Sequence, residues 1–237
     1  MNVATTLSPL TFDVVNLSPA DIPVVYELYR RALAAVPDPA AVRADEPSFF
    51  EDMFAVGGEI LGLRCDGDLV AYGVLRPELA REHDRVGLDG LVAPDAVMRV
   101  LDGSAVRPDF WAHGLQRTII DARIVRAGEE GASSVIAKAA PRNVPSMRNL
   151  TKRGFRIVGR VMKPYGWRYI HHRPVADEPV HPEDGTWTVS EDVDGSEARF
   201  EDGFYACSAQ RDPHGVPLLR FAPERLPRTA PRADTAH

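Results

Sequence analysis

The alternation of apolar and polar residues along the first third of the chain predicts a strand, two helices and a hairpin. Period-two alternation indicates a strand, whereas apolar residues that recur every three or four positions indicate a helix. By these patterns the expected elements are a strand at 11–17, a helix at 18–36, a short helix at 48–55, and strands at 59–65 and 69–75. Asp66-Gly67-Asp68 joins the last two strands and is typical of a tight hairpin turn.

The middle of the chain continues with strands and helices in alternation. The expected elements are a strand within 94–106, a helix from His113 to about Gly128, a strand at 134–139, a short helix after Asn143, and strands at 156–162 and 167–172. Gly103 lies inside the first of these strands, where a glycine often marks a bulge or a close approach of two backbones. The alternation predicts an α/β (α+β) fold.

The character of the sequence changes after Pro174. An acidic, proline-containing stretch predicts a linker, and Asp-Gly turns then separate short apolar runs, which predicts a small β meander. Its expected strands are 186–190, 198–200 and 204–208. The expected parts of the chain are a main domain at 1–175, a small β extension at 176–221, and a disordered tail, rich in Pro and Arg, at 222–237.

Composition excludes several classes of function. The chain has 237 residues, of which 44% are apolar, and its net charge of −6 argues against a nucleic-acid partner, which normally requires a basic face. Cys65 and Cys207 lie far apart, which predicts neither a metal site nor a disulfide and favours a reducing compartment. No apolar run approaches the roughly 20 residues of a membrane span, and the N-terminal stretch does not resemble a signal peptide. We expect a soluble, cytoplasmic protein that binds no nucleic acid, membrane or metal.

The stretch from Ser104 to Phe155 carries the candidate chemistry. It is expected to form a strand, a Gly-containing turn and a helix start, then a second strand, Asn143, a short helix and Gly154-Phe155. At such a strand–turn–helix junction, unpaired N–H groups and the helix dipole face the same spot, which binds anions. On these residues the chain resembles the GNAT (GCN5-related) N-acetyltransferase superfamily over about residues 11–173.

The family's central motif is a strand that ends in Val, a Pro, an aromatic residue and an Arg/Gln-x-x-Gly-x-Gly/Ala loop. The matching residues are Val106, Pro108, Phe110 and Gly114, and the departures are Trp111 and Gln116. The resemblance implies a mixed, mostly antiparallel sheet flanked by helices, and acetyl-CoA or another acyl-CoA as cosubstrate without a metal. The donor-binding residues that it implies are Ala105, Val106, Ala112, His113, Gly114, Leu115, Gln116, Arg117, Asn143 and Ser146. Asn143 also fits the cap of a helix, and both roles can hold together.

Catalytic groups are harder to assign, because Leu150 stands where the family commonly places its general acid, a Tyr. Asp102 shares a strand face with Ser104 and is the candidate base, although a solvated strand end also explains a carboxylate there. The candidate acid, acting through water, is one of four residues near the last expected strand, and Tyr165 is the first choice among Tyr165, Tyr169, His171 and His172. The segment 104–106 is expected to supply the N–H that stabilises the thioester oxygen.

The expected function is that of an acyl-CoA-dependent N-acyltransferase, with acetyl as the first choice of acyl group. The acceptor is expected to be a primary amine of a small molecule that attacks the thioester directly. Three alternatives stay open: a GNAT-fold module that binds CoA or a metabolite without transfer; a GNAT-fold enzyme that uses a carrier-protein thioester or decarboxylates an acyl group; and an α/β protein outside the family. A homodimer is also open.

Overall fold

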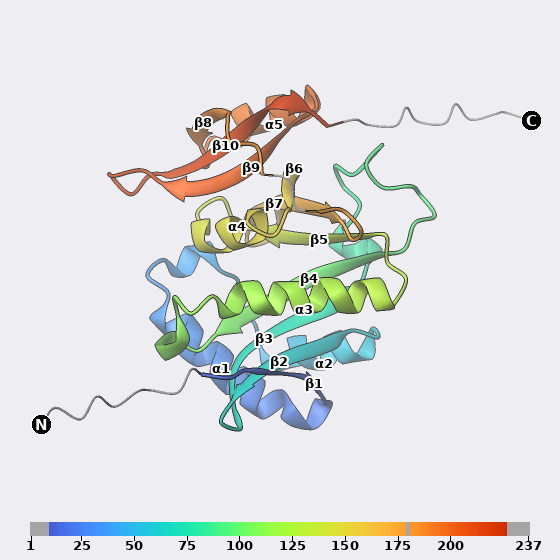
Figure 1. Ribbon diagram of the computed structural model, residues 1–237, viewed down its shortest axis with the longest axis vertical. Helices are drawn as coiled ribbons and strands as arrows, with labels where there is room; N and C mark the ends of the chain where they lie inside the picture. The colour runs from blue at the N-terminus through green and yellow to red at the C-terminus, as the bar shows by residue number, and fades with distance from the viewer. Residues whose placement is uncertain (1–9, 179–180, 227–237) are drawn as a thin grey trace, which may run out of the picture.

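One ten-stranded sheet organises the computed structural model, which describes residues 10–178 and 181–226 (Figure 1). The strands are β1 (Asp13–Leu17), β2 (Glu59–Cys65), β3 (Asp68–Pro77), β4 (Met98–Val106), β5 (Ser134–Ala139), β6 (Arg156–Lys163), β7 (Gly166–Pro174), β8 (Thr186–Val189), β9 (Phe204–Arg211) and β10 (Pro217–Arg225). The helices are α1 (Ile22–Ala35), α2 (Pro47–Ala55), α3 (Leu115–Glu129), α4 (Val144–Thr151) and α5 (Val193–Glu201).

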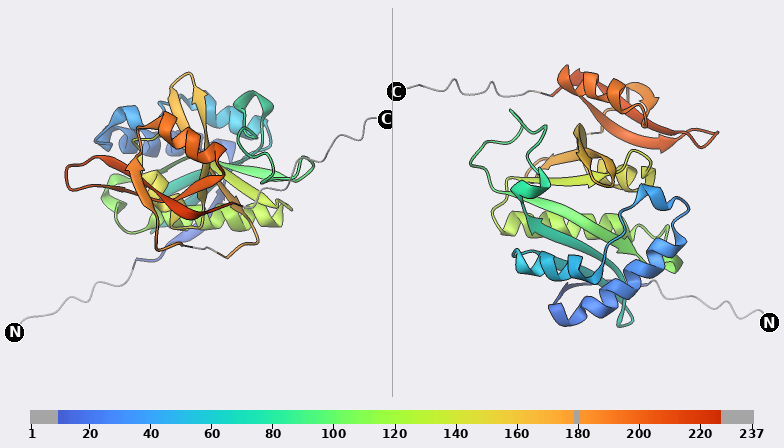
Figure 2. Two further views of the ribbon diagram at one scale, coloured as in Figure 1. Left: turned by 90° about the horizontal axis from the view of Figure 1, so that it is seen from above. Right: turned by 180° about the vertical axis from the view of Figure 1, so that it is seen from behind.

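The strands follow the order β1-β2-β3-β4-β5-β7-β6-β9-β10-β8 across the sheet. Every neighbouring pair is antiparallel except β4 and β5, which are parallel. The helices α3 and α4 cover one face, and α1 and α2 cover the other (Figures 1 and 2). The expected mixed, mostly antiparallel sheet flanked by helices is therefore confirmed. No helix of the described residues is both long and apolar enough to cross a bilayer.

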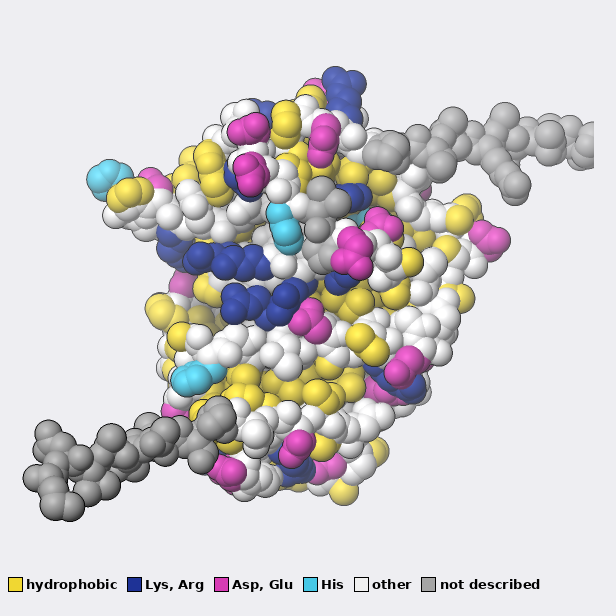
Figure 3. Space-filling view, in the orientation of Figure 1, with side chains coloured by type: hydrophobic (Ala, Val, Ile, Leu, Met, Phe, Trp, Pro, Cys, Tyr) yellow, Lys and Arg dark blue, Asp and Glu magenta, His cyan; other side chains and the backbone are white. Residues whose placement is uncertain are grey.

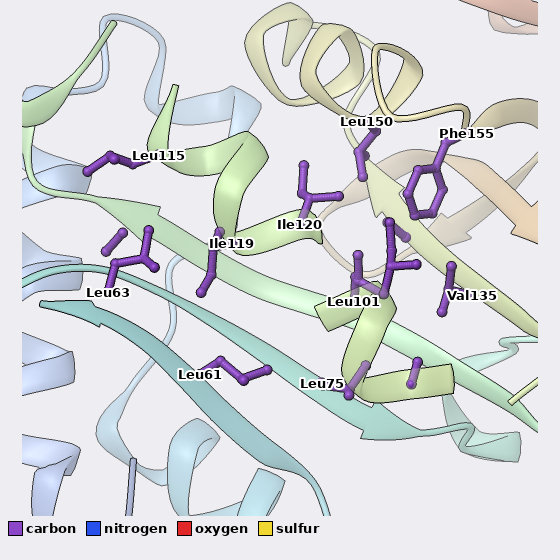
Figure 4. Packing of buried hydrophobic residues seen from close by; sticks show 14 of the residues in the cluster. Leu61, Leu63, Leu75, Leu101, Leu115, Ile119, Ile120, Val135, Leu150 and Phe155 are labelled. Atoms are coloured by element: carbon purple, nitrogen blue, oxygen red, sulfur yellow. The ribbon is translucent and has the colours of Figure 1, made fainter. Parts of the chain in front are cut away.

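Helix α3 is held on the sheet by its apolar side chains. Ile119 and Ile120 are fully buried, and Figure 4 shows Ile119 lying between Leu61 and Leu63 of β2. Burying such a side chain contributes roughly 1.5–3 kcal/mol relative to leaving it exposed. Because α3 is fixed in this way, its N-terminus has a defined position at the end of β4.

The strand expected within 94–106 is confirmed and spans Met98–Val106. The start of the helix that follows it differs from the sequence prediction, and the difference has a local cause. The helix expected from His113 begins at Leu115, because Gly114 adopts φ +80°, a left-handed conformation outside the helical range. The hairpin prediction is confirmed: Asp66 (φ 50°) and Gly67 (φ 85°) are both left-handed, as a two-residue hairpin turn requires.

The strand predicted at 198–200 is wrong, because these residues belong to α5. The carboxylate of Asp192 accepts a hydrogen bond from the N–H of Gly195 and caps the helix. Ser196 and Phe200 are buried four residues apart, which is the helical spacing. The Asp-Gly pair that predicted a turn is therefore the start of a helix.

The C-terminal strands lengthen the main sheet. Strand β9 pairs with β6 at Ala206 and Ile157, and β10 and β8 continue outward from β9. Because β10 runs to Arg225, the boundary predicted at residue 222 is wrong. The rest of the predicted tail, 227–237, lies outside the described residues.

Candidate active site

Strands β4 and β5 separate near the middle of the sheet. They pair only where Met98–Leu101 of β4 lies opposite Ser134–Ala137 of β5, although β4 continues to Val106 and β5 to Ala139. The register of β4 against β3 also shifts between Leu101 and Ser104, which places a bulge at Asp102-Gly103. The bulge predicted from Gly103 is thus confirmed, and it lies where the two strands part.

The register of β3 and β4 decides which backbone groups face this gap. Arg107 donates its N–H to the carbonyl of Val70 (2.8 Å). Val106 and its partner Ala71 therefore form a non-hydrogen-bonded pair of the antiparallel strands. The N–H and C=O of Val106, and by alternation those of Ser104, therefore point into the gap. Those of Ala105 point toward β3, so within the segment 104–106 the backbone groups that face the gap belong to Ser104 and Val106.

The loop between β4 and α3 leaves a row of backbone N–H groups unpaired. Ala112 and Gly114 have φ of +67° and +80°, and no group of the described chain accepts from the N–H of residues 112–116. Trp111, a departure from the family motif, donates its indole N–H to the carbonyl of Val106 (2.8 Å) and so fixes the loop to the end of β4. With the helix dipole of α3 behind them, these N–H groups form an anion-binding cradle.

Basic side chains surround this cradle. A Cβ on Gly114 would lie 3.1 Å from a terminal nitrogen of Arg117, so that guanidinium sits directly beside the turn. Arg148 of α4 and Lys152, the residue that follows the helix, are exposed. On this face Lys and Arg side chains form bands at the level of α4, next to the N-terminal half of α3 (Figure 3). The surroundings of the cradle are therefore cationic, which suits a polyphosphate.

Polar side chains of α4 border the gap. Asn143 caps the helix by accepting from the N–H of Ser146 (3.1 Å), so the capping role predicted for it is confirmed. Gln116, the second departure from the motif, accepts a hydrogen bond from Asn149 (2.7 Å) and so links α3 to α4. No periodic or motif signal in the sequence singled out Asn149. The remaining predicted loop residues differ in exposure: the side chain of Leu115 is buried, whereas His113 is exposed.

A cleft passes through the gap from one face of the sheet to the other. Asp102, Gly103 and Ser104 lie at its middle. On the face of α3 and α4 its lining includes Gln116, Ile120, Asn143, Ser146 and Leu150. On the opposite face its lining includes Arg43, Asp45, Arg76, Glu82, Lys138, Tyr165 and Arg168. Two molecules that enter from opposite faces would therefore meet beside Ser104.

Asp102 belongs to a buried ionic network at the bulge. Arg76 lies between two carboxylates, with its Nη1 2.6 Å from Asp84 and its Nε 2.6 Å from Asp102. Burial acts to raise the pKa of Asp102, but the charges of Arg76 and Arg43 outweigh it and hold this pKa below its usual value. Asp102 is therefore ionised at neutral pH, accepts hydrogen bonds well, and is a weak base.

The pKa of Asp45 is shifted in the opposite direction, upward. Burial raises the pKa of its carboxyl, and the neighbouring Arg43 only partly offsets this. The hydroxyl of Tyr29 accepts from the N–H of Asp45 (2.6 Å) and donates to the carbonyl of Arg43 (3.0 Å), which fixes the loop. Sequence reasoning missed Asp45 and Arg43, because they lie in an irregular loop without periodicity.

Tyr165 connects two distant parts of the chain over the cleft. Arg43, from the connection between α1 and α2, places a terminal nitrogen 3.4 Å from the Tyr165 hydroxyl and its guanidinium 5.4 Å from the ring centroid. Arg168 of β7 stacks on the same ring at 4.6 Å. The loop with Arg43 and the β6–β7 hairpin thus meet and form a roof on this face.

The described residues contain no group of three or more His, Cys, Asp or Glu side chains arranged to hold a metal ion. Cys65 and Cys207 are both buried and free.

The sequence matches the model of the acetyltransferase (GNAT) family over residues 22–155, more than half of the chain. The chain therefore belongs to the GNAT acetyltransferase family, and it is an N-acetyltransferase that uses an acyl-CoA. No curated protein matches it in sequence.

Solved structures agree with this assignment at the level of the fold. The ribosomal-protein-S18-alanine N-acetyltransferase of Escherichia coli is similar with a TM-score of 0.52 and 18% identity, over 72% of this chain and 99% of that one. The putative acetyltransferase yncA of Salmonella typhimurium, solved with its cofactor acetyl-CoA, gives a TM-score of 0.52 and 17% identity, over 75% of this chain and all of that one.

Proposed function

We propose that the protein transfers an acetyl group from acetyl-CoA to a primary amine of a small molecule, and that the amine attacks the thioester directly. The cleft that passes between β4 and β5 carries this proposal, because it opens on both faces of the sheet. The donor enters from the face of α3 and α4, and the acceptor enters beneath the roof on the other face.

In this proposal the chain holds the donor mainly through backbone groups. The N–H groups of residues 112–116 bind the pyrophosphate, and the gap-facing N–H of Val106 and the side chain of Asn143 bind the pantetheine arm. The N–H of Ser104 meets the thioester oxygen. As the amine nitrogen bonds to the carbonyl carbon, negative charge grows on that oxygen, and a preorganised N–H donor stabilises it. The C–S bond then breaks and CoA leaves as a thiolate.

Protons move between groups of the acceptor face. Asp102, whose pKa is held low by Arg76 and Arg43, anchors the ammonium form of the amine rather than taking its proton. Asp45, with its raised pKa, accepts the proton directly or through a water molecule. The hydroxyl of Tyr165 supplies a proton to the thiolate through water. Alignment of donor and acceptor in one cleft also lowers the barrier, by on the order of 7–11 kcal/mol at best.

The roof formed by Arg43 and Tyr165 favours a small molecule over a protein as the acceptor. Contacts between Arg43 and Tyr165 bridge the acceptor face, so a protein N-terminus or a lysine on a folded surface would have to break them to enter. A small molecule needs only the space beneath.

A thermal melt with and without acetyl-CoA tests the donor site. Ligand at 100 times its Kd stabilises by about 2.7 kcal/mol, which is a shift of roughly 5–10 °C for a chain of this size. Gly114→Trp should abolish the shift, because the bulky side chain fills the cradle. Gly131→Trp is the matched control: it is also left-handed (φ +76°), has open space around it, and follows the other end of α3.

Retention of the shift in Gly114→Trp would remove the phosphates from this loop. No shift in the wild type with acetyl-CoA or CoA would contradict the free acyl-CoA donor and favour a carrier-protein thioester.

A further inference from the structure

The acceptor end of the cleft is lined by cations, and nearly all of them have anionic or carbonyl partners within the protein. Arg43 contacts Asp45 and Asp102, and Arg76 lies between Asp84 and Asp102. Lys138 pairs with Asp84, and the fully buried Arg123 donates to the backbone carbonyls of Ile119, Val74 and Asp102.

Arg168 has the fewest partners of these cations: among the described residues it has no carboxylate partner, and its one carbonyl partner belongs to the adjacent residue. It lies on β7, one residue before Tyr169, and Tyr169 pairs with Ala139, the last residue of β5. Arg168 therefore has no partner residue on β5 and lies beside the gap. Its side chain lines the cleft although the residue is only 7% exposed. Its one hydrogen bond is to the carbonyl of Trp167 (2.8 Å), and no carboxylate of the described residues lies within salt-bridge distance. Burial lowers the pKa of this guanidinium, as expected for a charge without an anionic partner.

Burying a guanidinium without an anion is costly, and an anionic ligand that pairs with it recovers much of that cost. The ring of Tyr165 stacks on Arg168 and holds its plane in place, which preorganises the planar fork for two parallel hydrogen bonds. We propose that Arg168 binds a carboxylate of the acceptor, so that the substrate is a compact amine that also carries a carboxylate, as an amino acid does. This inference rests on the acetyltransfer proposed above.

The charges around Arg168 fit such a substrate at both of its ends. Asp102, beside the bulge, and Asp45 face the ammonium group of the substrate, whereas Arg168 faces its carboxylate. One unpaired guanidinium matches the single charge of a carboxylate, whereas a phosphate monoester carries close to two charges. A simple amine would leave Arg168 unpaired in the complex.

The test compares the common amino acids with the amines left by their decarboxylation, such as phenylalanine with phenethylamine, and includes O-phosphoethanolamine. Turnover is followed as release of the CoA thiol from acetyl-CoA. We expect kcat/KM in the wild type to favour the carboxylated member on the order of 100-fold, the value of a charge-assisted pair. Arg168→Met should remove this preference by lowering kcat/KM for the amino acid alone, and Arg168→Lys should restore part of it.

Arg160→Met is the matched control. Arg160 lies on the neighbouring strand β6 and stacks on Trp167 (4.2 Å) much as Arg168 stacks on Tyr165, but it pairs with Asp194 and Glu197 away from the cleft. It should keep the preference. Each variant is first melted with acetyl-CoA, which shows that it folds and binds the donor.

Each outcome decides. Loss of the preference in Arg168→Met, with the acetyl-CoA shift intact, supports the inference. Equal use of a carboxylate and its decarboxylated amine by the wild type, preference for O-phosphoethanolamine, or turnover of no carboxylated amine while acetyl-CoA binds would overturn it and leave the donor site standing. Failure of the wild type to bind acetyl-CoA would instead overturn the proposed function, and this inference with it.

Discussion

At the scale of single residues, two carboxylates close in space have environments that separate their roles. Asp102 is held by Arg76 and Arg43, which lower its pKa, whereas burial raises the pKa of Asp45. The sequence singled out Asp102 because simple alternation would place it on the strand face of Ser104; the bulge at Asp102-Gly103 interrupts that alternation, and Asp102 instead pairs with Arg76 in the ionic network. It did not indicate Asp45, since only the tertiary packing of an irregular loop brings that residue to the cleft.

The two roles predict different effects on the pH dependence of turnover. A base acts only when deprotonated, so kcat should rise with pH through the raised pKa of Asp45. Asp45→Asn should lower kcat on the order of 100-fold and remove this limb of the profile. Asp102→Asn should mainly raise the KM of the acceptor and keep the limb. Loss of the limb in Asp102→Asn alone would return the role of base to Asp102.

At the scale of elements, regular and amphipathic segments were predictable, and irregular ones were not. The hairpin of β2 and β3, helix α3 and the bulge of β4 each have a local signal in Gly or in apolar spacing. Helix α5 has only a weak local signal, because its Asp-Gly pair and its few apolar residues also fit a turn. The ionic network at the acceptor end could not be predicted, because its members come from a loop, three strands and the β3–β4 connection.

Strand β7 is a central element with both faces buried, which has a consequence for acid stability. His171 and His172 point to opposite faces, and burial lowers the pKa of each from 6.5 to about 4. Between pH 4 and pH 6.5 the unfolded chain therefore binds more protons than the folded protein. The contribution of these histidines to the free energy of unfolding is complete above about pH 6.5 and is lost as the pH falls toward 4. The loss is on the order of 3 kcal/mol per histidine.

Denaturant unfolding of the wild type and His172→Gln across pH 4–7 measures this effect. The variant should show a smaller slope of unfolding free energy against pH, whatever its absolute stability, because one titrating group is gone. His214→Gln, at an exposed position, should keep the wild-type slope. Equal slopes in all three proteins would contradict the assignment.

At the scale of the whole molecule, the C-terminal extension is part of the core. Phe200, Leu219 and Phe221 are buried in one cluster with Met147 and Tyr169 of the acetyltransferase portion. The hydroxyl of Tyr169 also donates to the carbonyl of Ser190 (2.7 Å). The sequence predicted strands after residue 185 but not this packing, because contacts between distant segments leave no local pattern.

Truncation after Val175 should therefore expose apolar surface on α4 and β7 and yield a protein that aggregates or melts well below the full chain. Truncation after Leu226 is the control, because it leaves every described contact in place, and its melting temperature should equal that of the full chain. A soluble protein with an unchanged melting temperature after the first truncation would show that the extension is dispensable for folding.

The pairing of β9 with β6 also bears on self-association. An open sheet edge offers unpaired N–H and C=O groups that can recruit a strand from another molecule. Here the chain supplies that strand itself, so the β6 side of the acetyltransferase sheet is already occupied. Within the described sheet, the outermost strands are β1 and β8. A second copy that extended the sheet would therefore have to pair there, far from the cleft, and each molecule would keep a complete acceptor site of its own.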